Sequence, residues 1–229
     1  MEKINKLKKL FTKYNLDGYL IPKNDEFFNE YVSQNKDDLK YISNFSGSYG
    51  LALILKKNNF LFVDGRYSVQ ASIQSGMSFK IITLPIRQIN LHIKNKKIGF
   101  DPKLFNEKTI KQFSKKLGIV CVAVNDNFIK LIKKKKNETK KSKQFYVLNK
   151  SIVGENSLRK FKKLKKNFYE NNIDIMLITS SENVAWLLNI RGNDSDYSPI
   201  PNCFLIIDKQ IKFFFFCDLK KINNKFKKK

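Results

Sequence analysis

The sequence contains one histidine and three cysteines, and these shortages exclude several kinds of site. Zinc sites need cysteine and histidine at close spacing, whereas Cys121, Cys203 and Cys217 lie far apart, in or beside apolar runs. We therefore expect buried, reduced thiols. His92 lies between a strand and a Lys/Asn-rich turn with no carboxylate pair at ligand spacing, so we expect a surface histidine and no metal site.

Long apolar runs are missing as well. The first ten residues have the pattern of an amphipathic helix, and the uninterrupted apolar stretch of a signal peptide does not follow them. The longest late apolar run, Phe213 to Cys217, is too short to span a bilayer. We therefore expect a cytoplasmic protein without a membrane partner.

Arginine is scarce, since the 45 basic residues include only Arg66, Arg87, Arg159 and Arg191. A chain that uses lysine elsewhere can keep arginine where a planar fork must bind a carboxylate or a peptide carbonyl. Arg66 follows Asp64-Gly65 at a predicted strand-to-helix turn, where a ligand can reach it. Position alone favours the alternative, a structural ion pair between Arg66 and Asp64.

The formal net charge of +25 is typical of proteins that bind nucleic acid or an acidic membrane surface. However, the lysines are spread over almost every predicted helix, which indicates a compositional bias with charges on solvated faces. The sequence has no zinc-finger spacing, no aromatic RNA-binding signature and no Gly-rich phosphate loop. We expect weak binding to polyanions at low salt and no specific nucleic-acid partner.

Helical and strand patterns alternate in the first half of the chain, which predicts an α/β domain. The predicted strands are 18–22, 51–55, 60–63, 79–84, 97–100 and 119–124. The predicted helices are 2–15, 25–31, 37–42, a helix that starts at Arg66, and 106–117. The hairpin formed by 51–55 and 60–63 makes the sheet mixed rather than purely parallel.

A lysine-rich run begins at residue 133, and such like-charged runs are typical of exposed linkers. We predict a first domain at 1–132, a linker at 133–150 and a partial second domain at 151–229.

The second domain repeats the order of the first. A helix capped by Asn156 precedes a strand at 175–179, a helix at 182–188 and a hairpin of 204–207 with 213–217. Asn172-Ile173-Asp174 introduces its strand as Asn15-Leu16-Asp17 introduces the first one. We infer an internal duplication. The second copy stops soon after Asp218, so its last strand is predicted to be an edge strand that exposes apolar surface.

Several motifs stand in a characteristic order: Leu16–Pro22, Tyr41–Gly50, Val63–Tyr67 with Gln70-Ala71, Gly154-Glu155, and Asn183–Asp194 with Tyr197 and Pro199. In this order they resemble the N-terminal part of aminopeptidase P, the Xaa-Pro aminopeptidase of the creatinase/prolidase family. The resemblance implies a mixed-sheet α/β domain followed by a second, similar domain that is incomplete here.

The family removes an N-terminal residue that precedes proline, using two metal ions, usually Mn²⁺. The resemblance implies that two aspartates, a histidine and two glutamates bind these ions in a C-terminal catalytic domain, which the matching motifs do not include. We therefore expect no catalytic residue and no metal ligand in this chain, and no hydrolysis by the chain alone.

The resemblance implies a role for the arginine of the Asp-Gly-Arg-Tyr motif, Arg66. In the family this arginine contacts the peptide substrate, often at the active site of a partner subunit, so the substrate role overtakes the ion-pair alternative. Asp64 is expected to cap or orient Arg66, and Tyr67 to pack the start of the helix.

The sequence also suggests roles for Arg191 and Trp186. Arg191 is expected either to border the substrate cleft or to form an ion pair with Asp194 or Asp196. Trp186, between Ala185 and Leu187, is expected to be a core residue.

The leading hypothesis is a non-catalytic N-terminal portion of a Xaa-Pro metalloaminopeptidase, contributing substrate contact and dimer assembly. Its partners would be a peptide with proline at the second position and either a second copy or a separate catalytic half. The alternative is a stand-alone peptide- or protein-binding module of the same fold without hydrolysis. A basic nucleic-acid-binding protein is the third hypothesis.

Overall fold

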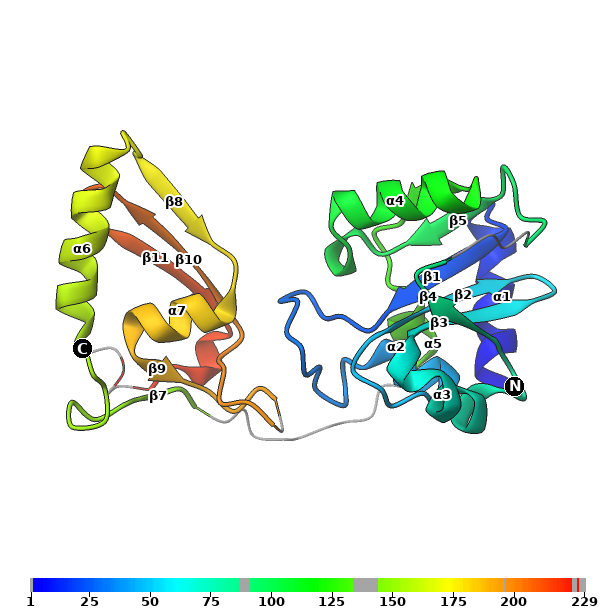
Figure 1. Cartoon of the computed structure of the whole chain (residues 1–229), viewed down its shortest axis with the longest axis horizontal. Coiled ribbons are helices and arrows are strands. Elements are labelled where there is room, and N and C mark those ends of the chain that lie inside the picture. Colours follow the sequence, from blue (N-terminus) through cyan, green and yellow to red (C-terminus); the bar gives the residue numbers. More distant parts are fainter. Residues whose placement is uncertain (1, 87–90, 134–143, 196, 224–225, 227–229) are drawn as a thin grey trace. The chain divides into compact units, whose positions relative to one another are not determined.

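The computed structural model describes residues 2–86, 91–133, 144–195, 197–223 and 226. The chain forms two compact units (Figure 1). Unit 1 comprises residues 1–26 and 34–137, and unit 2 comprises residues 27–33 and 138–229.

Unit 1 is built on one mixed sheet with the strand order β4-β3-β2-β1-β5-β6. The strands are β1 (Gly18–Pro22), β2 (Gly50–Leu55), β3 (Asn59–Asp64), β4 (Lys80–Leu84), β5 (Lys97–Phe100) and β6 (Val120–Ala123). β1, β2 and β3 pair antiparallel, whereas β4, β5 and β6 join parallel to their neighbours. The predicted mixed α/β fold is confirmed.

Two apolar clusters cover the two faces of this sheet. One joins it to α1 (Glu2–Lys13), α2 (Asp38–Ser43), α3 (Ser68–Ser75) and α5 (Phe128–Ile132). The other joins it to α4 (Glu107–Leu117) and to η2 (Pro102–Leu104). Strands that are buried on both faces read as continuous apolar runs, as β2 does.

Unit 2 has a three-stranded sheet in the order β11-β10-β8, and a smaller β7–β9 pair. Its elements are β7 (Tyr146–Val147), α6 (Ser157–Glu170), β8 (Ile175–Ile178), α7 (Ser181–Leu188), β9 (Ile190–Arg191), β10 (Cys203–Asp208), β11 (Phe213–Cys217) and η3 (Leu219–Lys221). Asn156 caps α6 as predicted, accepting a hydrogen bond from the Arg159 amide. In the described part of the chain, β11 is an edge strand, also as predicted.

The backbone confirms the internal duplication. α1-β1-α2-β2-β3 and α6-β8-α7-β10-β11 follow the same order, and each strand trio pairs antiparallel. Asn15 and Asn172 both adopt positive φ just before the first strand. Asn44 and Asn189 both end their helices in the left-handed conformation, which asparagine tolerates better than most residues.

The predicted helix over residues 25–31 is wrong. These residues form a turn, a bend and irregular backbone, and 27–33 belong to unit 2. The rings of Phe27 and Phe204 stack with centroids 4.8 Å apart, and Asn29 Nδ2 donates to Asn202 Oδ1 at 2.6 Å. Packing of Phe27 on a distant strand therefore overrides the local helical pattern.

The predictions for the scarce residues can also be compared with the structure. Cys203 is buried, and Cys121 and Cys217 are half-buried, all with free thiols. His92 lies at the surface, as predicted.

The described residues contain no helix of the length and apolarity needed to cross a bilayer.

Candidate functional site

Arg66 lies in η1 (Gly65–Tyr67), directly after β3, and is held there by Asp64. The Asp64 Oδ1 atom accepts hydrogen bonds from the backbone amide and from the Nε atom of Arg66, both at 2.9 Å. The Arg66 side chain is still 74% exposed. The ion pair and an accessible guanidinium therefore coexist.

The pKa of the Asp64 carboxyl group is held below its ordinary value of 3.8, chiefly by the hydrogen bond from the Arg66 side chain. Asp64 therefore stays ionised at neutral pH and keeps its hold on Arg66.

Tyr67 packs the start of α3 and joins it to the loop before β2. Its ring meets the buried Phe45 ring edge-to-face, with centroids 5.8 Å apart. The hydroxyls of Tyr67 and Ser48 form a hydrogen bond of 2.9 Å. The guanidinium carbon of Arg66 lies 5.5 Å from the centroid of the Tyr67 ring, a cation–π distance.

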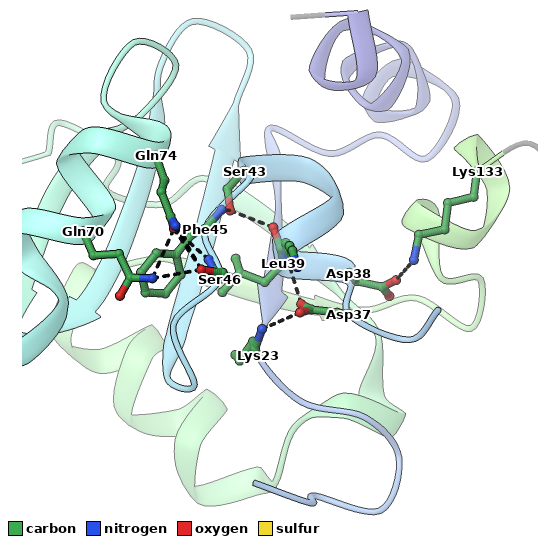
Figure 2. Close-up of polar contacts among 11 residues, drawn as sticks. Lys23, Asp37, Asp38, Leu39, Ser43, Phe45, Ser46, Gln70, Gln74 and Lys133 are labelled. Carbon is green, nitrogen blue, oxygen red and sulfur yellow. Dashed lines mark hydrogen bonds and ion pairs between the residues drawn. The ribbon is translucent and has the colours of Figure 1, made fainter. Parts of the chain in front are cut away.

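Two glutamines of α3 also bind the loop of residues 44–49, as Figure 2 shows. Gln74 Oε1 accepts from the Ser46 amide at 2.9 Å, and Gln70 Nε2 donates to Ser46 Oγ at 2.9 Å. Ser75 Oγ donates to the Ser43 carbonyl at 2.7 Å. The sequence does not indicate the roles of Gln74 and Ser75, because each role depends on a hydrogen bond to a residue 28 or 32 positions earlier in the chain.

Buried ion pairs hold α2 behind this loop (Figure 2). Asp37 caps α2 by accepting from the Lys40 amide at 2.9 Å and also pairs with Lys23. Asp38 pairs with Lys133 at 2.6 Å. Because the Lys23 and Asp37 side chains are almost fully buried, loss of either partner would leave an uncompensated charge.

Arg191 occupies a different setting in unit 2. Its Nη1 atom donates to the backbone carbonyls of Ile190 at 2.8 Å and Ala185 at 3.3 Å. Asp194 instead pairs with Lys221 and accepts from the Asn202 amide. The predicted pair of Arg191 with Asp194 is therefore not formed, and Asp196 lies outside the described residues.

The expectation that Trp186 is a core residue is wrong, because 58% of it is exposed. Val184, Ala185 and Leu187 form the buried stripe of α7, which places Trp186 on the other side. Lys160 Nζ lies 4.2 Å from the centroid of the tryptophan ring. The buried Lys160 also donates to Asn189 Oδ1 at 2.6 Å, and desolvation lowers its pKa.

The described residues do not fit a metal pair, because they contain no group of three or more His, Cys, Asp or Glu side chains that could hold an ion. We therefore derive no catalytic step from them. What the arrangement around Arg66 offers is a positioned cation at the rim of a sheet, suited to an oxygen ligand.

Models of one protein family match both parts of the chain. The Creatinase/Prolidase N-terminal domain model matches residues 3–131, and a second model with the same description matches residues 139–229.

Similar proteins are longer than this chain. Xaa-Pro aminopeptidase 1 of Dictyostelium discoideum is 25% identical over 244 aligned residues, covering 99% of this chain and 39% of that protein. The probable Xaa-Pro aminopeptidase P of Laccaria bicolor is 26% identical over 218 residues, covering 90% and 34%. Thus the chain spans between about one third and two fifths of the length of these relatives.

A solved structure matches both units. It is the X-prolyl aminopeptidase of Caenorhabditis elegans, described as a cytosolic enzyme with a di-nuclear active site. It is 25% identical, with a TM-score of 0.86 over 99% of this chain and 40% of that one. From these matches, the chain belongs to the creatinase/prolidase family and comprises N-terminal domains of the aminopeptidase P type.

Proposed function

We propose that this chain is the peptide-contacting, non-catalytic N-terminal portion of a cytoplasmic Xaa-Pro aminopeptidase. The observation that carries the proposal is the likeness to the C. elegans X-prolyl aminopeptidase across 99% of this chain. The substrate would be a peptide with proline at its second position.

Arg66 is the residue through which the chain would contact that peptide. Its guanidinium is exposed and oriented by Asp64, and a planar fork matches a carbonyl or carboxylate oxygen. Asp64 would act as a positioning residue, and Tyr67 would fix the helix start beneath it. Arg191 is the second candidate contact, although its Nη1 atom binds backbone carbonyls.

The hydrolytic chemistry would come from residues outside this chain, which would hold two metal ions. We propose that both ions are Mn²⁺. The di-nuclear site of the C. elegans enzyme supports a pair of metals. A second copy of the chain or a separate catalytic half would complete the assembly.

A chimaera tests the proposal. This chain would replace the matched 40% of the C. elegans enzyme, and kcat/KM would be measured on an Xaa-Pro peptide. We expect Arg66→Ala to lower kcat/KM about 10- to 100-fold, the range for loss of a hydrogen bond from a charged group.

Arg159→Ala is the matched control, because Arg159 is an exposed arginine on α6. It should leave kcat/KM unchanged. An Arg66→Ala chimaera with full kcat/KM would contradict the substrate role of Arg66. Peptide binding by the 229-residue chain together with an inactive, folded chimaera would instead favour a stand-alone binding module.

A further inference from the structure

The strand register of unit 2 places two cysteines directly opposite one another. β10 and β11 pair antiparallel, and Cys203 is the partner of Cys217 across the two strands. The whole chain has three cysteines, so two of them share one register position. The third, Cys121 of β6, lies opposite Ile98 of β5.

The hydrogen bonds around Cys203 show which kind of strand pair this is. Its amide donates to Ser181 Oγ at 3.4 Å, and its carbonyl accepts from the same hydroxyl at 3.2 Å. The N–H and C=O groups of one strand residue point to the same side of the strand, so neither group of Cys203 faces Cys217. Cys203 and Cys217 therefore form a non-hydrogen-bonded pair.

The other end of the hairpin gives the same answer. The Asp208 amide donates to the Lys212 carbonyl at 3.0 Å, which makes these two residues a hydrogen-bonded pair. Hydrogen-bonded and non-hydrogen-bonded pairs alternate along an antiparallel ladder. The alternation from Asp208 back to Cys203 again makes Cys203 and Cys217 a non-hydrogen-bonded pair.

A non-hydrogen-bonded pair has the spacing that a disulfide needs. Residues opposite each other in such a pair have Cα atoms about 4.5 Å apart, and their side chains lie on the same face of the sheet. Disulfides join residues whose Cα atoms are roughly 4.4–6.8 Å apart. A bond between Cys203 and Cys217 therefore requires no change in the strand register.

The surroundings of the two thiols favour a disulfide over other oxidised forms. Cys203 and Cys217 belong to the same apolar cluster as Leu205 and Phe215. Cys203 is fully buried, whereas Cys217 is half-buried, so an oxidant from solvent reaches Cys217 first. A disulfide is apolar and suits this cluster, whereas a buried sulfenic acid would need hydrogen-bond partners.

Both thiols are protonated at neutral pH. Burial raises the pKa of Cys203 to about 12. Burial, followed by the Asp218 carboxylate, also raises the pKa of Cys217 above its ordinary value of 9.0, and the Lys221 ammonium opposes this rise. Because the thiolate is the reactive form, the reduced pair is the resting state and reacts only when oxidant is in excess.

We propose that Cys203 and Cys217 form an oxidation site, at which a hydroperoxide converts the thiol pair into a reversible intramolecular disulfide. This inference goes beyond the proposed function and does not depend on Arg66.

The reaction with hydrogen peroxide balances in two steps. In the first, Cys217 Sγ loses its proton and attacks a peroxide oxygen. The O–O bond breaks, Cys217 becomes a sulfenic acid, and the departing hydroxide takes the proton to form water. In the second, Cys203 Sγ attacks the Cys217 sulfur, the S–O bond breaks, and the departing hydroxide leaves with the Cys203 proton as a second water. The two thiols are oxidised and the peroxide is reduced.

The disulfide would close the open end of the β10–β11 hairpin. The turn between Asp208 and Lys212 already closes the opposite end. A cross-link at both ends restricts the conformations that the opened hairpin can reach. We therefore expect local opening of β10 and β11 to become rarer in the oxidised protein.

The test treats the 229-residue chain with excess hydrogen peroxide at neutral pH. Remaining thiols are blocked with N-ethylmaleimide in denaturant, and peptides are mapped by mass spectrometry without reduction. We expect a linked peptide that joins Cys203 to Cys217 as the main product, and its loss after treatment with dithiothreitol. Hydrogen exchange of the β10 and β11 amides should be about tenfold slower in the oxidised protein.

Three variants make the result specific. Cys217→Ser and Cys121→Ser are matched, because both replace a half-buried cysteine of a strand. Cys217→Ser should abolish the linked peptide and the slower exchange, whereas Cys121→Ser should preserve both. Cys203→Ala should leave the sulfenic acid of Cys217 unresolved, so that dimedone labels it.

Oxidation of Cys217 to a sulfenic or higher acid without a link to Cys203 would overturn the proposal. So would a main product that joins one of these cysteines to Cys121 or to a second chain. A Cys217 thiol that stays reduced in excess peroxide would overturn it as well. No peptide substrate takes part, so each of these failures leaves the proposed function of Arg66 untouched.

Discussion

Asp64 and Arg66 form a single positioning unit at the residue scale. One carboxylate oxygen accepts two hydrogen bonds from the same arginine, one from its backbone and one from its side chain. The carboxylate thereby fixes both the first turn of η1 and the direction of the guanidinium. The ion pair and the ligand contact are thus compatible, because an oriented guanidinium is a better ligand for an oxygen atom than a mobile one.

The pKa of Asp64 provides a direct check of this unit. Arg66 lowers the pKa of Asp64 below 3.8 in the folded state, so the ion pair stabilises the folded protein at pH values above the unfolded pKa of Asp64. This stabilisation is lost as pH falls through the folded pKa. We expect Arg66→Gln to raise the Asp64 pKa towards 3.8 in a carboxyl NMR titration. If Asp64 titrates at the same pH in Arg66→Gln as in the unsubstituted protein, the hydrogen bond between the Arg66 and Asp64 side chains would be contradicted.

Sequence patterns predict a residue's role well where the cause is local. The capping by Asp64 and Asn156 follows from residue type and the position before a helix. The prediction that Trp186 is a core residue was wrong because a helix of eight residues has only one buried stripe, and smaller side chains occupy that stripe. The role of Gln74 depends on a loop 28 residues away, which no local pattern shows.

At the element scale, the loop before β2 depends on the absence of a side chain at Gly47. A Cβ atom there would lie 2.3 Å from the Phe45 ring, and that ring is fully buried. We expect Gly47→Ala to destabilise the protein by about 1–3 kcal/mol, the cost of overpacking, measured by denaturant unfolding.

Gly65→Ala is the control for that prediction, since a Cβ at Gly65 meets only Thr83 at an ordinary 3.6 Å. It should change stability by less than about 0.5 kcal/mol. Equal effects of the two substitutions would show that the packing of Phe45 under Gly47 is not the cause.

The N-terminus of α2 gives a second prediction at this scale. Asp37 both caps the helix and neutralises the buried Lys23. We expect Asp37→Ala to cost about 3–5 kcal/mol in denaturant unfolding, because it leaves a buried ammonium unpaired.

The double variant Lys23→Met with Asp37→Ala should recover much of that loss, because the unpaired charge is gone. If the double variant is no more stable than Asp37→Ala, the missing cap and not the buried charge accounts for the effect.

Most elements could be predicted from the sequence because their signals are strong. β1 and β5 have the predicted bounds, and the hairpin of β2 and β3 follows from two apolar runs around a polar turn. The error at 25–31 and the omission of α5 concern short segments. Their structure is decided by distant contacts, such as those of Phe27 with Phe204 and Phe128 with Tyr19.

At the scale of the whole molecule, the internal duplication explains why both units end their three antiparallel strands in the same kind of turn. The same strand trio supports Arg66 in unit 1 and Lys220 in unit 2, each after a capping aspartate. In unit 1 helices lie on both faces of the sheet, and among the described residues of unit 2 α6 and α7 lie on one face of theirs.

The most direct test of the central claim is a titration of the 229-residue chain with an Xaa-Pro tripeptide in the presence of Mn²⁺. NMR follows the Arg66 Nε–H resonance, and mass spectrometry follows the peptide in the same sample. We predict that the Arg66 resonance shifts while the peptide stays intact, and that Arg66→Ala removes the binding. Cleavage of the peptide, or an Arg66 resonance that does not move at saturating peptide, would contradict the account.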